Sequence, residues 1–449
     1  LSSDHMTRDL VVQRPEGLYC PAGDFHIDPW RPVPRAVITH GHGDHARIGM
    51  GLYHCARESL PILRWRLGEQ NFAAHDYGET FTLGDARLSL HPAGHVLGSA
   101  QVRIEVDGEV WVVSGDYKRQ PDPTCAPFEV VPCDVFVTEA TFGLPVYRWP
   151  DTTAVARDIL AWRDECAAEG VAAVLFCYAL GKAQRLLAEL GRLDDTPAWL
   201  HGAIAAGVEV YREAGIAMLP THTIDAGARG TDYAGQLVLA PPSAAGSPWI
   251  RRFRRAQTGF ASGWMQLRGN RRRRNIDRGF VVSDHADWPA LLRTVRETGA
   301  RRIIATHGDT DALVRLLNEE GLRTDVFRTE YTGEAGAESA GGAGGDIGIA
   351  GNAGGVRAGA DAGQRQRLVR IDRQVARRAG EGGVADRQVA VEAEEVHMAL
   401  TGRAGEDLTI AREARSGDGD GPHRRRVDRV GAIGRMGIEE ADRGGILDR

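Results

Sequence analysis

The sequence predicts an α/β protein, because two kinds of hydrophobic pattern follow one another along the chain. Residues 6–145 contain short apolar runs separated by turn residues, which is the pattern of successive β-strands. Residues 146–275 alternate helical patterns with fully apolar runs, which is the pattern of a parallel sheet covered by helices. The chain has 449 residues, 42% of them hydrophobic and 26% charged, and is long enough to bury two cores.

Particular segments justify each element. The run Val102–Val113 is expected to form a hairpin that turns at Asp107–Gly108. Thr153–Glu169 and Lys182–Leu190 are expected to form helices, because their apolar residues recur at helical spacing. Between them, Val171–Tyr178 reads as a buried strand, so this part of the chain predicts a separate α/β subdomain.

Two further segments complete the predicted organisation. Residues 276–331 carry two histidines of interest, His285 and His307, and we expect this segment to complete the first domain after the inserted subdomain. Residues 332–449 form a tail rich in Gly, Ala and Arg that lacks Phe, Trp, Tyr, Cys and Lys. Such a tail cannot bury a core that offsets the entropy of ordering, so it is predicted to be disordered.

The composition argues against a membrane or secreted protein. No apolar run approaches the roughly 18 residues that a membrane span requires. The first residues lack the basic and then apolar profile of a signal peptide. The six cysteines form no Cys-x-x-Cys pair and lie in or near apolar stretches, as reduced and packed thiols do. We therefore expect a cytoplasmic protein with no membrane partner.

The most informative motif is His40–His45, which places three histidines and one aspartate in a single turn after the apolar run Ala36–Ile38. Imidazole and carboxylate groups are the ligands that zinc and similar divalent ions prefer. A chance cluster of surface histidines is the alternative, and four candidate ligands in six residues make it much the weaker one. The motif therefore predicts a two-metal site.

Three more candidate ligands each follow an apolar run and precede a small residue or a turn: His95, Asp116 and His307. A β scaffold delivers catalytic groups to one rim of its sheets in this way. Taken alone, each of them could be a hydrogen-bonded structural histidine or an aspartate that caps a turn. Together with His40–His45, they predict one shared site.

These motifs resemble those of the metallo-β-lactamase-fold nucleases that carry the β-CASP insertion. The matching positions, in chain order, are Asp28, His40–His45, His95, Asp116, Glu139, His285 and His307. Leu18–Phe25, Gly181–Arg185 and Ser283–Trp288 resemble, more closely still, the bacterial ligase-associated DNA exonucleases. The resemblance covers residues 6–331 and implies an αββα sandwich with an inserted β-CASP subdomain.

The resemblance also implies a ligand set for two divalent ions, zinc in the first place and manganese as the alternative. The ligands of the first ion would be His40, His42 and His95. The ligands of the second would be Asp44, His45 and His307, and Asp116 would bridge the two ions. Ions so placed would activate a shared water and bind the phosphodiester oxygens for in-line attack.

Three other residues would assist the reaction, again as the resemblance implies. Asp28 would orient ligands without binding metal itself. His285, held in its tautomer by Glu139, is the candidate general acid that would give a proton to the leaving sugar oxygen. The predicted catalytic set consists of His285, Glu139, Asp44 and Asp116.

Two arginine clusters and one lysine are candidates for binding nucleic acid. They are Arg251, Arg252, Arg254, Arg255, Arg271, Arg272, Arg273, Arg274 and Lys182. Phe260 and Trp264 lie between the clusters, and arginine combined with aromatic faces suits a single strand. Lys182 begins a predicted helix, whose N–H groups could also meet a phosphate. A solvated basic loop and a solvated lysine are the alternatives, and the net charge of −6 favours neither reading.

The function expected from these observations is a DNA exonuclease of DNA repair, linked in function to an ATP-dependent DNA ligase and a helicase. A β-CASP ribonuclease is the main alternative, because a histidine such as His307 in the last motif is usual for RNA enzymes, whereas many DNA enzymes carry valine. A small-ester metallohydrolase would usually lack the insertion and the Glu139 and His285 motifs. An inactive scaffold would have lost the metal positions, which are intact in this sequence.

Overall fold

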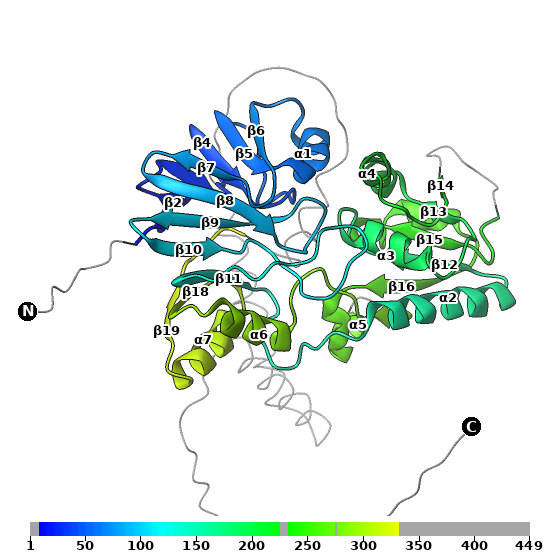
Figure 1. The fold of residues 1–449 in the computed structure, drawn as a ribbon. Coiled ribbons are helices and arrows are strands. Elements are labelled where there is room, and N and C mark those ends of the chain that lie inside the picture. The colour runs from blue at the N-terminus through cyan, green and yellow to red at the C-terminus, as the bar shows by residue number, and fades with distance from the viewer. Residues whose placement is uncertain (1–8, 225–231, 274–275, 332–449) are drawn as a thin grey trace, which may run out of the picture. The chain divides into compact units, whose positions relative to one another are not determined.

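The structure is a computed structural model that describes residues 9–224, 232–273 and 276–331 (Figure 1), with the backbone alone at residues 271–273. It is a mixed α/β structure with three sheets, as the sequence predicts. Among the described residues, no helix combines the length and the apolar composition needed to cross a membrane.

The chain divides into two units, Leu1–Gly348 and Ile349–Arg449, and every described residue lies in the first. The tail that the sequence predicts to be disordered, residues 332–449, lies outside the described residues. The same holds for Arg274. The fold and the candidate site are therefore properties of the first unit.

The first sheet contains six strands in the order β1-β2-β3-β4-β5-β6. Their bounds are Val12–Arg14 (β1), Gly17–Cys20 (β2), Phe25–Ile27 (β3), Arg35–Ile38 (β4), Leu52–Ala56 (β5) and Phe72–His75 (β6). The first three strands pair antiparallel, and β3 to β6 pair parallel. Helix α1 (Leu60–Leu67) packs against this sheet, since Leu63 shares a buried cluster with Ile38 of β4.

The second sheet contains seven strands in the order β19-β18-β11-β10-β9-β8-β7. Their bounds are Thr80–Leu83 (β7), Ala86–Pro92 (β8), Ala100–Val106 (β9), Glu109–Val113 (β10), Val135–Ala140 (β11), Arg302–Gly308 (β18) and Arg323–Val326 (β19). The predicted hairpin is confirmed as β9 and β10, with Glu109 opposite Val106 and positive φ at Asp107 and Gly108. β18 pairs parallel with β11, so the end of the described chain rejoins this sheet.

Two buried clusters show how the layers pack. One joins the first sheet to the second through Phe25, Val37, Leu88 and Ile104. Full burial of an aliphatic or aromatic side chain contributes roughly 1.5–3 kcal/mol, so this interface stabilises both sheets. The other cluster joins the second sheet to helices α6 (Trp288–Thr298) and α7 (Thr310–Glu319), which lie beside β11 and β18 in Figure 1.

The third sheet lies between β11 and β18 in the sequence, has the strand order β14-β13-β15-β12-β16-β17, and is parallel throughout. The strand bounds are Ala172–Phe176 (β12), Ala198–Leu200 (β13), Thr221–Thr223 (β14), Leu237–Ala240 (β15), Ala256–Ala261 (β16) and Arg278–Phe280 (β17). Its helices are Thr152–Ala168 (α2), Lys182–Leu190 (α3), Gly202–Glu213 (α4) and Arg268–Arg273 (α5). The 3-10 helices of the described chain are Arg57–Ser59, Pro242–Ala244, Pro248–Arg252 and Gly263–Gln266.

The sequence predictions for this part are confirmed closely. Helix α2 begins at Thr152, where the Asp151 side chain accepts a hydrogen bond from Ala154 N and caps the first turn. Helix α3 covers the predicted residues, and the predicted strand is β12. Because all six strands are parallel, the loops after β12 and β17 leave the same edge of the sheet, which is the edge that meets the candidate site.

Candidate metal centre

The candidate ligands come from turns that follow strand ends. His40, His42 and His45 follow β4, and His95 lies between β8 and β9. Asp116 follows β10, and His307 lies at the end of β18. These strands belong to two sheets that pack face to face, so their ends reach a common rim. The sequence residues that predict a shared site therefore come together in space.

The first group of ligands consists of His40, His42, His95 and Asp116, whose ligand atoms lie within 4.8 Å of one another. His42 Nδ1 is 3.1 Å from His40 Nε2 and 3.0 Å from His95 Nε2. Asp116 Oδ2 is 3.6 Å from His40 Nε2 and 3.7 Å from His95 Nε2. Three imidazole nitrogens and a carboxylate oxygen thus converge on one point.

The second group consists of His45, Asp116 and His307. His307 Nε2 lies 2.9 Å from Asp116 Oδ1, and His45 Nε2 lies 3.6 Å from Asp116 Oδ2. Asp116 is therefore shared by the two groups: Oδ2 lies near histidines of both, and Oδ1 lies nearest His307. Asp44 is next to the second group, with Oδ2 3.9 Å from His45 Nε2.

An oxygen atom holds the outward nitrogen of each of the five histidines. The contacts are His40 Nδ1 with Thr39 Oγ1 at 3.0 Å, His42 Nε2 with Leu180 O at 3.3 Å, His45 Nδ1 with Asp28 Oδ2 at 2.7 Å, His95 Nδ1 with Asp284 O at 2.7 Å, and His307 Nδ1 with Thr306 Oγ1 at 3.1 Å. Such contacts fix the ring orientation and the tautomer of histidines that bind metal. The inward nitrogens are therefore aimed by the protein.

The tautomers of two histidines follow from their partners. A backbone carbonyl only accepts, so His42 Nε2 and His95 Nδ1 must carry the hydrogen. Their inward nitrogens then present lone pairs to each other across 3.0 Å when the rings are neutral. Two facing lone pairs repel unless a cation lies between them. The donor set therefore fits a divalent metal ion, and so does the buried Nε2 of His45, which has no hydrogen-bond partner among the described residues.

The electrostatics of the two groups differ. Burial lowers the pKa of all three histidines of the first group, so their rings are neutral and able to donate lone pairs at pH 7. Burial opposes charge on His45 too, but the nearby carboxylates, Asp116 first, raise the pKa of His45 to about 10. Burial would raise the pKa of Asp116, but His45, His307 and His285 hold it well below the usual range.

Asp28 lies behind the second group, as its predicted orienting role requires. Its carboxylate accepts hydrogen bonds from His45 Nδ1 and, at 2.7 Å, from the backbone N of Thr39. The side chain is 1% exposed, and the backbone φ of Asp28 is +44°, a strained value for a residue with a side chain. The carboxylate thus holds both His45 and the strand end that leads to His40.

The pair of Glu139 and His285 adjoins the metal groups. His285 Nδ1 lies 2.8 and 3.0 Å from the two Glu139 carboxylate oxygens and 4.0 Å from Asp116 Oδ2. Glu139 also accepts a hydrogen bond from Tyr117 N at 2.8 Å, so its carboxylate is fixed from two sides. The structure therefore places the predicted general acid and its partner beside the ligands.

Lys182 is buried, whereas the sequence predicts a phosphate contact or a solvated lysine at this position. Its side chain is fully buried, Nζ lies 3.7 Å from Asp284 Oδ2, and the ammonium group sits 4.6 Å from the centre of the Tyr178 ring. Gly181, just before it, has φ +89°, and a Cβ there would lie 2.6 Å from Val96 Cγ1 and 3.7 Å from His42 Nε2. The loop after β12 thus packs tightly against the candidate metal centre.

Sequence reasoning missed a buried ionic network behind the ligands. Arg185 Nη1 donates to Ser283 O at 2.6 Å and to Asp284 Oδ1 at 3.3 Å, and Nη2 donates to Thr152 Oγ1. Lys118 pairs with Asp122, and its Nζ donates to His95 O at 3.3 Å. The network holds the peptide groups that contact His95 and His285.

The network has a definite charge state. Burial would raise the pKa of Asp284, but Lys182, Lys118 and Arg185 hold it well below the usual range. Lys182, Arg185 and Asp284 belong to the motifs Gly181–Arg185 and Ser283–Trp288, whereas Lys118 belongs to neither. No local pattern in the sequence indicates that these charged side chains are buried. Tyr331 was also missed; its ring stacks on His45 at 4.2 Å and its hydroxyl donates to Asp28 O.

The structure does not bring the first arginine cluster to the metal centre. Residues 251–255 precede β16, whereas the loops that contact the metal centre follow β12 and β17, at the opposite edge of the same sheet. The six residues of β16 separate the edges by roughly 20 Å. Arg252, Arg254 and Arg255 instead line a separate pocket of about 320 Å³.

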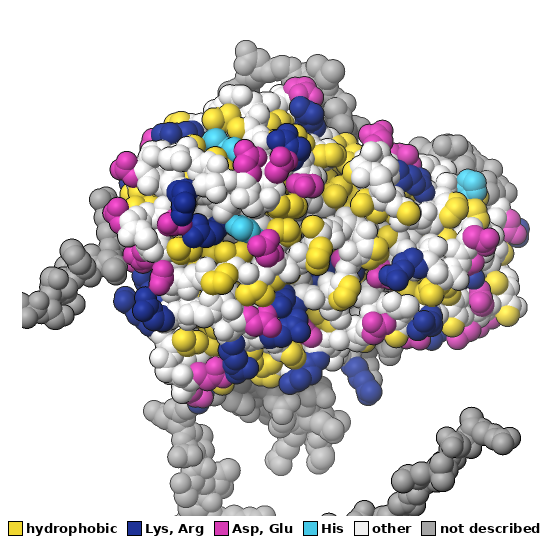
Figure 2. Space-filling view, in the orientation of Figure 1, with side chains coloured by type: hydrophobic (Ala, Val, Ile, Leu, Met, Phe, Trp, Pro, Cys, Tyr) yellow, Lys and Arg dark blue, Asp and Glu magenta, His cyan; other side chains and the backbone are white. Residues whose placement is uncertain are grey.

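The second arginine cluster lies outside the described side chains, so its contact with nucleic acid stays a prediction. The side chains of Arg271, Arg272 and Arg273 lie outside the described atoms, although these residues belong to α5. On the face in view in Figure 2, basic and acidic side chains are interspersed, without a large area of one sign. The described surface in that view therefore shows no broad basic stripe.

Comparisons with known proteins agree with the motifs. No family model matches the chain. The chain is 32% identical over 297 residues to a probable DNA ligase of Opitutus terrae, covering 65% of this chain and 28% of that protein. It is 27% identical over 204 residues to an RNase J-like protein of Methanocaldococcus jannaschii, covering 43% of this chain and 44% of that protein. It is 36% identical over 119 residues to the endoribonuclease YSH1 of Gibberella zeae, covering 25% of this chain and 14% of that protein.

The chain spans less than half the length of each of these relatives. They confirm its resemblance to the metallo-β-lactamase-fold nucleases of the β-CASP group, which the motifs indicated. The names of these relatives include both a DNA ligase and ribonucleases, so they differ on the nucleic acid.

Proposed function

We propose that this chain is a metal-dependent nuclease that hydrolyses phosphodiester bonds, and specifically a DNA exonuclease acting in DNA repair. The observation that carries the proposal is the arrangement around Asp116, where five histidines each turn one nitrogen inward and have the other held by an oxygen. The match to a probable DNA ligase over 65% of the chain supports DNA as the substrate.

The proposed architecture is a metallo-β-lactamase αββα sandwich interrupted by a β-CASP subdomain. Residues 6–145 and 276–331 would form the sandwich, and residues 146–275 the insertion. The two packed sheets with helices α1, α6 and α7 support the first assignment. The parallel third sheet, whose strands lie between β11 and β18 in the sequence, supports the second.

The proposed ligand set follows the two groups. His40, His42 and His95 would hold one divalent ion, and Asp44, His45 and His307 the other, with Asp116 shared. When bound, such ions would supply the positive charge that activates water near neutral pH and offsets the charge of the phosphodiester. Neutral imidazole and carboxylate donors suit zinc, and manganese is the alternative.

The protein's own groups would position and move protons. Glu139 holds Nδ1 of His285, which leaves the other ring nitrogen of His285 as the one that would deliver a proton to the leaving oxygen. Asp28 and the carbonyl of Asp284 would keep His45 and His95 in fixed tautomers through the reaction. Both roles require the short contacts that the structure contains.

A ribonuclease of the same group is the second candidate. His307 supports it, because a histidine in the last motif is usual for the ribonucleases that the chain resembles; its Nε2 lies 2.9 Å from the carboxylate of Asp116. The RNase J-like relative and the YSH1 relative bear names of ribonucleases. The two candidate functions share their metal chemistry and differ in the nucleic acid that is bound, DNA or RNA.

Cleavage of matched, end-labelled single-stranded DNA and RNA by the full-length protein, with zinc or manganese, tests both candidates. We expect stepwise shortening of DNA that is lost in His42→Ala and kept in His222→Ala, a substitution of an exposed histidine on β14. Cleavage of RNA alone would favour the ribonuclease. Cleavage of neither, or cleavage that survives His42→Ala, would contradict the proposed site.

A functional partnership with an ATP-dependent DNA ligase and a helicase is part of the same proposal. Its support is the ligase name of the Opitutus terrae relative, in which the matched segment makes up 28% of the protein. We expect removal of unpaired nucleotides at a nick to give ends that a ligase joins better than the untreated ends. Ligation assays on treated and untreated duplexes that carry an unpaired flap at the nick would measure the difference.

A further inference from the structure

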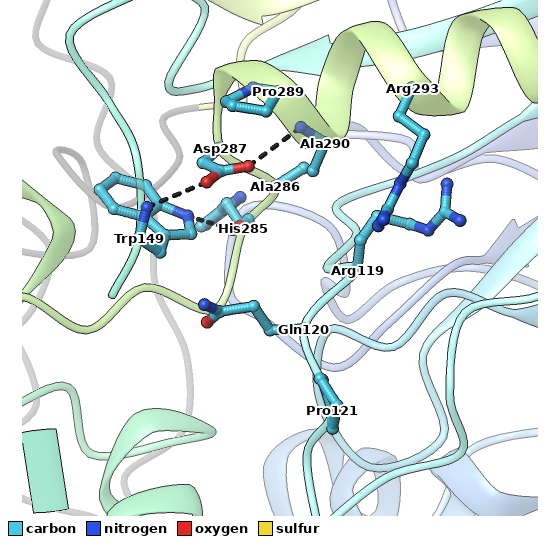
Figure 3. Close-up of a pocket in the computed structure, with 10 residues that line it drawn as sticks. All are labelled: Arg119, Gln120, Pro121, Trp149, His285, Ala286, Asp287, Pro289, Ala290 and Arg293. Carbon is cyan, nitrogen blue, oxygen red and sulfur yellow. Dashed lines mark hydrogen bonds between the residues drawn. The ribbon is translucent and has the colours of Figure 1, made fainter. Parts of the chain in front are cut away.

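A pocket of about 350 Å³ adjoins His285, outside the two metal groups (Figure 3). Its walls come from the loop after Asp116, the loop before α2 and the first turns of α6. Arg119, Trp149 and Arg293 line it together with His285. A cavity lined by two arginines, an indole and the candidate general acid His285 has the groups needed to bind a ligand.

Two guanidinium groups supply positive charge to this pocket. Arg119 is held in place, since it donates to Thr294 Oγ1 at 2.8 Å and to Glu297 Oε2 at 2.6 Å. Arg293 is exposed, and in Figure 3 its side chain extends from α6 toward Arg119. Arginine presents several N–H donors in one plane and pairs well with phosphate oxygens. One fixed and one exposed guanidinium therefore suit an entering anion.

The acidic residue in the pocket is already engaged. The Asp287 carboxylate accepts hydrogen bonds from Trp149 N at 2.9 Å and from Ala290 N at 3.0 Å, and so caps helix α6. Its charge is directed to backbone N–H groups, which weakens its repulsion of an anion near Arg293. Because Arg119 is paired with Glu297, Arg293 supplies most of the positive charge that would attract a phosphate to this pocket.

Trp149 gives the pocket a rigid aromatic side. Its Nε1 donates to the backbone carbonyl of His285 at 2.9 Å, and its ring meets Phe142 edge to face at 4.8 Å between centroids. The indole is only partly buried, so some of its surface remains open to a ligand. Aromatic side chains of this kind stack on nucleobases with little dependence on sequence.

We infer that this pocket binds the nucleotide unit next to the scissile phosphodiester, with Arg293 and Arg119 on its phosphate and Trp149 on its base. The inference rests on the proposed nuclease function and names a place for the part of the strand beyond the reacting bond. Because Trp149 is hydrogen-bonded to the His285 peptide, the same indole contacts the base and fixes the candidate general acid.

Calorimetric titration of the full-length, metal-loaded protein with thymidine 5′-monophosphate and with thymidine tests this inference. The wild type should bind the monophosphate more tightly than the nucleoside. Arg293→Met should weaken monophosphate binding about tenfold, the factor for one charge-assisted contact, with little change for thymidine. The matched control is Arg296→Met, on the same helix but outside this pocket, where Arg296 pairs with Glu320; it should bind as the wild type does.

Steady-state cleavage of an oligonucleotide gives a second measurement. Arg293→Met should raise KM about tenfold with a smaller change in kcat, and Arg296→Met should change neither. Equal binding of the monophosphate and the nucleoside by the wild type, or indistinguishable behaviour of the two variants, would overturn the inference. Monophosphate binding that depends on Arg293 in a protein without cleavage activity would support the pocket and count against the proposed function alone.

Discussion

The sequence predicts both the candidate metal centre and a nucleic-acid contact at the arginine segment 251–255, and the structure places these two regions apart. Three of the five histidines are buried and the other two, His42 and His307, are partly buried; each has one nitrogen held by an oxygen and the other aimed at a shared point. In the arginine segment, Arg251, Arg254 and Arg255 are exposed, at the far edge of the third sheet. Candidate ligands at strand ends therefore predict that their side chains meet at one point. A run of charged residues predicts only that the segment is basic, and not where its side chains lie.

The physical reason lies in how many contacts fix each group. His95 has its ring nitrogen on Asp284 O and its backbone N on Ser99 Oγ, so its position is determined by several elements. Arg255 has one weak contact, from Nη1 to Glu169 O at 3.3 Å. Long side chains with few partners keep their rotamer entropy, so their conformation is set only when a ligand binds. The comparison leads to four predictions, ordered by the size of the expected effect.

The largest effect is expected for Asp116→Ala, which removes the carboxylate that both metal groups share. Activity on end-labelled DNA should fall by more than about a hundredfold, since even the groups behind metal ligands are worth 10–100-fold. The control Asp76→Ala removes an exposed carboxylate that pairs with Arg57 and should leave the rate unchanged. Equal rates for the two variants would remove the distinction between the site and the surface.

Arg185→Met should lower activity by about 10–100-fold, because it frees the peptide of Ser283 and Asp284 that positions His95 and His285. Added guanidinium should restore part of the rate, which it would not do if the variant were merely unfolded. Arg192→Met, at an exposed arginine just after α3, is the control and should need no rescue. A variant with normal kcat would show that the buried network has no positioning role.

Gly181→Ala should destabilise the protein by about 1–2 kcal/mol, since alanine resists positive φ, and should also weaken metal binding. The added Cβ would lie 2.6 Å from Val96 Cγ1 in a loop that touches His42. Gly202→Ala, at the first residue of α4 with no atom near the added Cβ, should be neutral. Thermal unfolding followed with and without zinc would measure both effects, and equal melting temperatures would contradict the packing argument.

The smallest effect is expected for Arg254→Ala, in the segment far from the metal centre. If a long single strand reaches that edge, the slope of log affinity against log salt should fall by about 0.7, the value for one phosphate contact. Cleavage of a dinucleotide should not change. Loss of dinucleotide cleavage would place this segment at the active site and end the contrast between the two regions.

Much of the fold could be predicted because local patterns determine it. The hairpin at Asp107–Gly108 has turn residues that accept positive φ, and the helix Lys182–Leu190 has helical spacing and a preceding glycine. The histidines could be predicted to converge because strand ends gather at one rim. These signals are contained in a few neighbouring residues, so the sequence alone is sufficient to read them.

The ionic network behind the site could not be predicted in the same way. Arg185 meets Asp284, 99 positions along the chain, and a basic residue on a helix is by default solvated. The position of Lys182 at the start of a helix predicts a phosphate contact, and the structure instead pairs this lysine with Asp284. Pairing between distant segments depends on how the third sheet packs against the other two. This packing cannot be predicted from a few neighbouring residues.

Metal content of the full-length protein, measured by mass spectrometry after saturation with zinc or manganese and removal of the excess, tests the central claim most directly. We expect two divalent ions per chain in the wild type and a loss of at least one in Asp116→Ala. A wild-type protein that retains no ion, or an Asp116→Ala variant that retains both, would contradict the assignment of this cluster as a two-metal centre.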